Sequence, residues 1–231
     1  LVAPLVPPVV PGAFQLAASL YKDDALLQDA FRTGAGVGWH EHHGDLFEGT
    51  ERFFRPGYTA NLVETWLPAL DGVEGKLLSG ATVADVGCGH GASTIIMAQA
   101  FPRSSFVGSD YHDASIQPAR RAAEAACVDD RVRFDVAGAA DYAGGGYDLV
   151  AMFDCLHDMG DPVGASKHVH QSLDAGGTWL IVEPRAAETV EENHNPVGRI
   201  FYAATTLLSV PASRAQDDGW WLGGQAGADR T

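Results

Sequence analysis

The stretch VADVGCGHGAST, from Val83 to Thr94, carries the most information in this chain. Its apolar start predicts a buried strand, its glycines a tight turn, and its end the beginning of a helix. A turn of this kind lets the backbone approach a ligand closely, and the free N–H groups of the following helix point at the same place. We therefore expect an adenosine-containing cofactor to bind here.

From Thr82 onward, short apolar runs alternate with helical patterns. The predicted strands are Thr82–Val86, Ser105–Ser109, Val132–Val136, Asp148–Phe153 and Thr178–Val182. The predicted helices between them are Gly91–Ala100, Ala114–Ala126 and Pro162–Leu173, the last with Asp161 as N-cap. Regular alternation of strands and helices indicates an α/β fold with a doubly wound, mostly parallel sheet.

The two ends of the chain differ from this pattern. The first eighty residues lack strand signals, and helical spacing of apolar residues predicts one helix from Phe14 to Gly34. The tail carries one predicted helix, Arg199–Leu208, and then a polar, glycine-rich stretch with no pair of strands.

Composition limits the classes of partner. The 231 residues include 30 Asp and Glu against 15 Lys and Arg, a net charge of −15, so a nucleic-acid substrate is not expected. Cys88, Cys127 and Cys155 are few and widely spaced, as is typical of a reducing compartment such as the cytoplasm. No run approaches the roughly 18 apolar residues of a membrane span, and four prolines interrupt the apolar start, so we do not expect it to be a signal peptide.

The residue Asp85 helps to choose the cofactor. The letters GCGHGA satisfy the dinucleotide pattern G-x-G-x-x-G/A, so a nicotinamide cofactor is a genuine competitor, whereas a P-loop is excluded because the Lys-Ser/Thr pair is missing. A carboxylate at position 85, two residues before Gly87, would lie close to a pyrophosphate. S-adenosylmethionine has no phosphate and carries an ammonium and a sulfonium, both of which a carboxylate favours.

The motif Asp85, Gly87, Gly89 and Gly91 resembles the first motif of class I S-adenosylmethionine-dependent methyltransferases, which have a Rossmann-like fold. The resemblance implies that Asp110, at the end of the second strand, binds the ribose hydroxyls and that Tyr111 covers the adenine. It also places Ala139 and Asp141 at the adenine edge and Asp154 at the cofactor. For Asp141, a role as a helix cap or loop residue stays open.

A polar cluster follows the fourth predicted strand. The letters LHDMGDP resemble a stretch of small-molecule O-methyltransferases, in which the histidine takes the proton of a hydroxyl acceptor, although Met159 stands where those enzymes have tryptophan. The resemblance makes His157 the candidate base, and Asp158 and Glu183 complete the predicted catalytic group. A purely structural histidine in the loop is the alternative.

A longer match, from about Pro11 to Pro211, resembles a bacterial group of these methyltransferases with a winged-helix-like N-terminal domain. It implies a helical lid over residues 1–80 and a cofactor-binding domain over residues 81–231, with an acceptor pocket lined by Trp39, His40, His42, Phe53, Phe54 and Tyr58. The histidines near position 40, with Glu41 and Asp45, also resemble a metal site or an ordinary polar loop, and we expect no metal. Relative to the group, we expect the chain to be truncated at both ends, without the C-terminal hairpin.

The expected function is transfer of a methyl group from S-adenosylmethionine to a small-molecule acceptor, with a hydroxyl as the expected target. Two alternatives remain open at this point: a nicotinamide-dependent oxidoreductase, and a module that binds the cofactor without catalysis. We expect neither nucleic acid nor membrane as partner, and a homodimer is left open.

Overall fold

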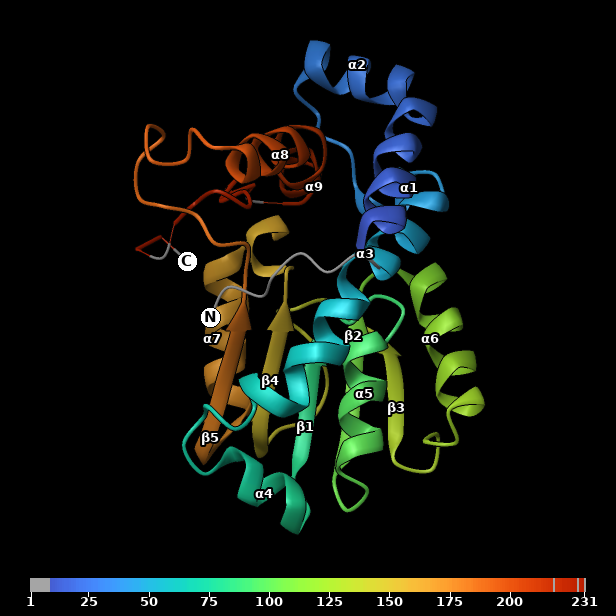
Figure 1. The fold of residues 1–231 in the computed structure, drawn as a ribbon, viewed down its shortest axis with the longest axis vertical. Coiled ribbons are helices and arrows are strands. Elements are labelled where there is room, and N and C mark those ends of the chain that lie inside the picture. Colours follow the sequence, from blue (N-terminus) through green and yellow to red (C-terminus); the bar gives the residue numbers. More distant parts are fainter. Residues whose placement is uncertain (1–8, 218, 228, 231) are drawn as a thin grey trace.

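The structure, a computed structural model, describes residues 9–217, 219–227 and 229–230. Five parallel strands form its sheet in the order β3-β2-β1-β4-β5 (Figure 1). Their bounds are β1 Thr82–Val86, β2 Ser105–Asp110, β3 Val132–Val136, β4 Tyr147–Phe153 and β5 Leu173–Val182. The predicted parallel, doubly wound sheet is therefore confirmed.

The central strands are apolar on both faces because helices cover both faces. Val83 and Leu149 point into a core shared with the helices on one side, while Ala84 and Val150 point into a second core on the other. The first side carries α4 (Val73–Ser79), α5 (Ala92–Ala100) and α6 (Asp113–Ala125), and the second carries α7 (Pro162–Ser172). As predicted, the Asp161 carboxylate caps α7, accepting the N–H of Gly164 at 2.7 Å.

Before the sheet come helical segments with no strand among residues 9–80. They are α1 (Val9–Lys22), α2 (Asp24–Thr33), the 3-10 turn η1 (Trp39–Glu41), α3 (Asp45–Asn61) and the π-helical turn η2 (Leu62–Trp66). The single helix predicted over residues 14–34 is wrong, since the chain breaks at Asp23. The buried carboxylate of Asp23 holds the ring of His42 at 2.9 Å and the N–H of His43 at 3.1 Å.

After the sheet, α8 (Pro196–Ala204), the π-helical turn η4 (Thr205–Ser209) and α9 (Val210–Arg214) run on from one another. They lie above the carboxyl ends of the strands, across from α1 and α2 (Figure 1). β5 lies at one edge of the sheet, and no described residue adds a strand beside it. Within the described ranges, none of the helices has both the length and the apolar character needed to span a bilayer.

Candidate functional site

A large cavity lies at the carboxyl ends of the strands, covered by the helices that precede and follow the sheet. Its volume is about 1440 Å³, above the range of roughly 300–1,000 Å³ that is usual for one drug-sized ligand. The site therefore has room for a cofactor and a second molecule. In open α/β folds, ligands bind at this end of the sheet.

The floor of the cavity is polar and is built from the segments that follow β1 to β4. The lining residues on these segments are Gly87, Cys88, Gly89, His90, Asp110, Tyr111, His112, Ala137–Asp141, Asp154, Cys155, His157 and Asp158. Neighbouring parallel strands thus bring together side chains that lie far apart in the sequence.

The glycine turn after β1 approaches the cavity with bare backbone. Gly87, Gly89 and Gly91 all have positive φ, of 73°, 52° and 78°. A Cβ placed on Gly89 would meet no atom within 4 Å, so this residue borders open space in the cavity. Its N–H donates to Asp110 Oδ2 at 2.9 Å, which joins the turn to the end of β2. The turn forms a cradle that a side chain at Gly89 would partly fill.

Asp85 lies behind this turn and is not among the lining residues. It is 1% exposed, and its Oδ2 accepts the hydroxyls of Ser93 and Thr94, both at 2.6 Å, at the start of α5. Its Oδ1 has no hydrogen-bond partner. Burial raises the pKa of Asp85 to about 6; the two hydroxyls oppose this rise, and the Asp110 charge adds to it. A cation in the cavity would stabilise the ionised form.

Asp110 and its neighbours form the next part of the floor. Burial raises the pKa of Asp110, against the opposing effect of the N–H groups of His112 and Gly89 that it accepts. The imidazole of His112 stacks on the ring of Phe47 from α3, with ring centroids 4.3 Å apart. A side chain of α3 therefore contacts the segment predicted to bind ribose and adenine.

Asp154 follows β4 in the left-handed conformation, with a φ of 52° that is uncommon for a residue other than glycine. Its Oδ2 accepts the hydroxyl of Tyr58 at 3.2 Å, and its N–H donates to the carbonyl of Val182 at 2.7 Å. Burial raises the pKa of Asp154 to about 7, and the nearby Glu183 charge raises it further, whereas His157 and Tyr58 oppose the rise. A charge bound nearby would therefore change the ionisation of this carboxylate near neutral pH.

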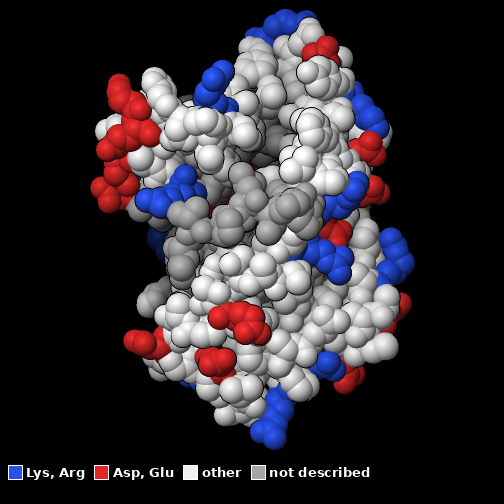
Figure 2. All heavy atoms as spheres, in the orientation of Figure 1, with Lys and Arg blue, Asp and Glu red and all other residues white. Residues whose placement is uncertain are grey.

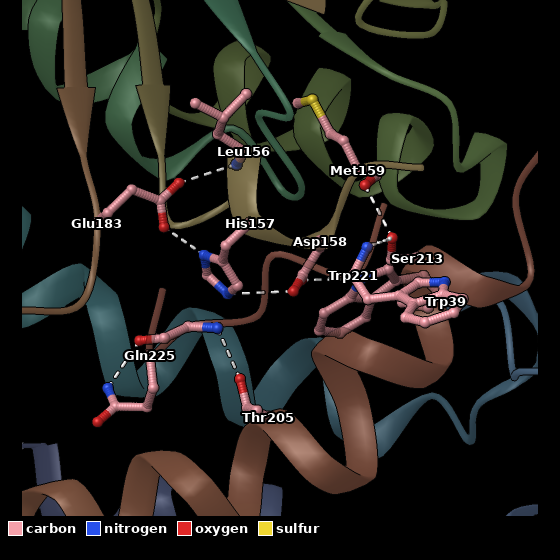
Figure 3. Close-up of polar contacts among 12 residues, drawn as sticks. Trp39, Leu156, His157, Asp158, Met159, Glu183, Thr205, Ser213, Trp221 and Gln225 are labelled. Atoms are coloured by element: carbon pink, nitrogen blue, oxygen red, sulfur yellow. Dashed lines mark hydrogen bonds and ion pairs between the residues drawn. The ribbon is translucent and has the colours of Figure 1, made fainter. Parts of the chain in front are cut away.

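His157 is held between two carboxylates (Figure 3). Its Nδ1 is bonded to Glu183 Oε2, and its Nε2 lies 3.1 Å from Asp158 Oδ1. Burial alone would lower the pKa of His157, but the ion pairs with Asp158 and Glu183 outweigh it, so the pKa is raised well above 6.5. Both carboxylates thus favour the protonated form of the imidazole.

Trp39 connects η1 to two parts of the floor. Its indole Nε1 donates to Asp158 Oδ2 at 3.2 Å, and its backbone N–H donates to the hydroxyl of Tyr111, also at 3.2 Å. The position of η1 therefore depends on the predicted catalytic group and on the predicted adenine-binding segment.

The upper part of the cavity is apolar. It is lined mainly by α1, α2, α3 and the segment from α8 to η4, through Leu16, Ala17, Leu20, Leu27, Phe31, Phe54, Ile200, Phe201, Leu207 and Leu208. A second molecule bound here would bury an apolar body while a polar group reached the floor.

The charge of the lining residues is strongly one-sided. Arg199 is the sole Lys or Arg among the lining residues that the structure describes, while Asp110, Asp154 and Asp158 line the floor and Asp85 and Glu183 lie just behind it. The face in Figure 2 likewise shows Lys and Arg scattered among Asp and Glu without a continuous basic patch. A cationic ligand fits this floor, whereas a pyrophosphate would meet carboxylates without a basic partner.

The structure brings most of the predicted site residues to one cavity. Those that line it are Trp39, Phe53, Phe54, Tyr58, Gly87, Gly89, Asp110, Tyr111, Ala139, Asp141, Asp154, His157 and Asp158. Those outside the lining are His40, His42, Asp85, Gly91 and Glu183. His42 is buried against Asp23, and His40 is exposed. Sequence reasoning missed Phe47, His112 and the residues of α8 and η4; only the aromatic character of Phe47 gave a signal.

Comparison with known proteins agrees with this geometry. Residues 84–179 match the protein-family model described as a methyltransferase domain. This segment is therefore similar to methyltransferase domains, as the glycine motif of the sequence also predicts. The anionic floor beside the glycine cradle fits S-adenosylmethionine, the cofactor that the sequence predicts. A search of curated proteins found no match.

Several solved structures share the fold. An O-methyltransferase family protein from Burkholderia thailandensis has 17% identity and a TM-score of 0.68, covering 96% of this chain and 63% of that one. PigF with SAH has 16% identity and a TM-score of 0.62, covering 94% and 62%. Mitomycin 7-O-methyltransferase MmcR has 16% identity and a TM-score of 0.61, covering 85% and 57%. The methyltransferase domain and its surroundings thus span about three fifths of these relatives' length.

Proposed function

We propose that the chain transfers the methyl group of S-adenosylmethionine to a hydroxyl of a small molecule with a largely apolar body. The observation that carries the proposal is that His157, paired with carboxylates, lines the polar floor of a cavity whose upper part is apolar. An apolar acceptor in the upper half would present its polar group to the floor at this histidine.

When bound, S-adenosylmethionine would supply an electrophilic methyl group, which the acceptor oxygen takes while the sulfonium sulfur leaves as a neutral thioether. The residues of the chain position the reactants and accept the proton. Glu183 holds Nδ1 of His157 and so orients the ring. The neutral form of His157, with Nε2 free of Asp158, takes the hydroxyl proton at Nε2.

The helical segment before the sheet would act as a lid, over residues 1–80 of a chain whose cofactor-binding domain is residues 81–231. Three side-chain contacts support this division: Tyr58 with Asp154, Trp39 with Asp158, and Phe47 with His112. Each joins a lid residue to a segment that follows a strand.

The experiment is incubation of the chain with methyl-labelled S-adenosylmethionine and a panel of phenols and aliphatic alcohols of increasing apolar surface. The proposal expects label in at least one product and loss of that label in His157→Ala. A His157→Ala variant that methylates at full rate would remove the proposed base.

A module that binds the cofactor without catalysis is the second candidate, because both ring nitrogens of His157 are engaged by carboxylates. It predicts that the chain binds S-adenosylmethionine and labels no member of the panel at any pH.

A further inference from the structure

The loop from His157 to Gly160 makes most of its backbone hydrogen bonds outside the sheet to the C-terminal part of the chain. Gln216, two residues beyond α9, makes two of them with one side chain. Its Oε1 accepts the N–H of Gly160 at 2.9 Å, and its Nε2 donates to the carbonyl of Asp158, also at 2.9 Å. The amide thus clamps the loop on both sides of Met159.

Neighbours of Gln216 complete the support. Three further bonds reach the loop: Gly223 N–H to His157 O at 3.1 Å, Trp220 N–H to Gly160 O at 3.0 Å, and Ser213 Oγ to Met159 O at 2.9 Å (Figure 3 shows the last). Every backbone carbonyl from His157 to Gly160 therefore accepts a hydrogen bond from residues 213–223.

The same tail closes the space beside the ring of His157. Gly224 is buried, and its N–H donates to Thr205 Oγ1 at 2.6 Å. A Cβ on Gly224 would lie 3.5 Å from His157 Nε2 and 3.3 Å from Thr205 Oγ1. The tail backbone thus lies directly beside the nitrogen at which the proposed proton transfer occurs.

We propose that Gln216 is a positioning residue for the proton acceptor, an inference that rests on the proposed function. η3 (Leu156–Asp158) is a single 3-10 turn, too short to fix its own end. Gln216 fixes the carbonyl of Asp158, which sets where the Asp158 carboxylate lies relative to His157 Nε2, 3.1 Å away. On the opposite side, Trp39 fixes the other oxygen of that carboxylate.

The test is the titration of His157 by NMR, in the intact chain and in Gln216→Ala. The charged groups that face His157 are Asp158, Glu183 and Asp154. Without the clamp, Asp158 drifts from Nε2, so we expect the His157 pKa to fall by about one unit, a tenfold weaker proton affinity. The affinity for S-adenosylmethionine should stay within about twofold, since the glycine cradle does not contact Gln216.

Two further variants sharpen the experiment. Gln216→Met keeps the length of the side chain but removes both the acceptor for Gly160 N–H and the donor to the Asp158 carbonyl, so it should also lower the His157 pKa relative to the intact chain. Gln171→Ala, at an exposed glutamine of α7, is the matched control and should change nothing.

An unchanged His157 pKa in Gln216→Ala overturns the proposal, and so does an equal shift in Gln171→Ala. If Gln216→Ala fails to fold, the Gln216→Met titration decides by the same criterion. The titration needs neither acceptor nor turnover, so failure of the proposed methyl transfer would be seen separately, as absence of labelled product.

Discussion

The affinity for S-adenosylmethionine should rise with pH, because Asp154 on the cavity floor and Asp85 buried behind the glycine turn both have raised pKa values. The pKa is about 7 for Asp154 and about 6 for Asp85. A cationic ligand favours the ionised carboxylate, so each group contributes above its pKa and its contribution is lost as pH falls. The sign is therefore fixed: acid weakens binding.

The size of the change in affinity follows from the ionised fractions of the two carboxylates. Between pH 7.5 and 5.5, the ionised fraction of Asp154 falls from about 76% to about 3%, which is roughly 25-fold in affinity if the ligand requires the charge. Asp85 alone would give about fourfold over the same interval. The upper limit of pH 7.5 keeps the ligand's α-amino group largely protonated, since α-amino groups titrate near 7.7–8.0.

The assay is titration calorimetry at several pH values with the chain, with Asp154→Asn and with a control, Asp129→Asn, at an exposed aspartate. Asp154→Asn should retain only the shallow dependence of Asp85, about fourfold, and the control should follow the original curve. S-adenosylhomocysteine, which lacks the sulfonium charge, should show a weaker dependence. An affinity that is flat or falls between pH 5.5 and 7.5 would refute the reasoning.

Three further predictions concern the same cavity. His157 must be neutral to accept a proton, and its pKa is raised, so the rate of methyl transfer should increase with pH through a value well above 6.5. Asp158→Asn should move this increase to lower pH, because it removes one partner of the ion pair. A pH–rate profile that does not move would contradict the ion pair. Gly89→Val should weaken cofactor binding at least tenfold, with the helical circular dichroism retained, because the side chain enters open cavity and φ is positive; unchanged affinity would exclude the cradle. Tyr58→Phe removes a hydrogen bond that lowers the pKa of Asp154, so NMR titration should find that pKa higher, and a lower value would be inconsistent with the contact.

The sheet could be predicted from local pattern because its strands are apolar and bounded by turns. β1 and β3 match the predicted bounds, Thr82–Val86 and Val132–Val136. β5 begins at Leu173 instead of Thr178, because its glycine-rich start pairs with Tyr147 across an irregularity in the register. Only the position of β4 makes that segment a strand, and no local pattern reveals it.

The candidate site was predictable where residues follow strands, as at Asp110, Asp154 and His157, because parallel strands end at one edge. Contacts between residues that lie far apart in the sequence could not be predicted. The helical pattern breaks at Asp23, whose carboxylate bonds to the ring of His42. Gln216 bonds to Gly160 and Asp158, which lie 56 and 58 residues earlier in the sequence. A lone glutamine in a polar tail carries no signal of such a role.

The central claim is that the glycine cradle and its carboxylates hold S-adenosylmethionine, not a dinucleotide. Its most direct test is heat unfolding of the chain alone, with S-adenosylmethionine and with NAD⁺, each ligand at a hundredfold excess over a micromolar dissociation constant. We expect stabilisation by about 2.7 kcal/mol with S-adenosylmethionine and none with NAD⁺. Stabilisation by NAD⁺, or by neither ligand, would contradict the account.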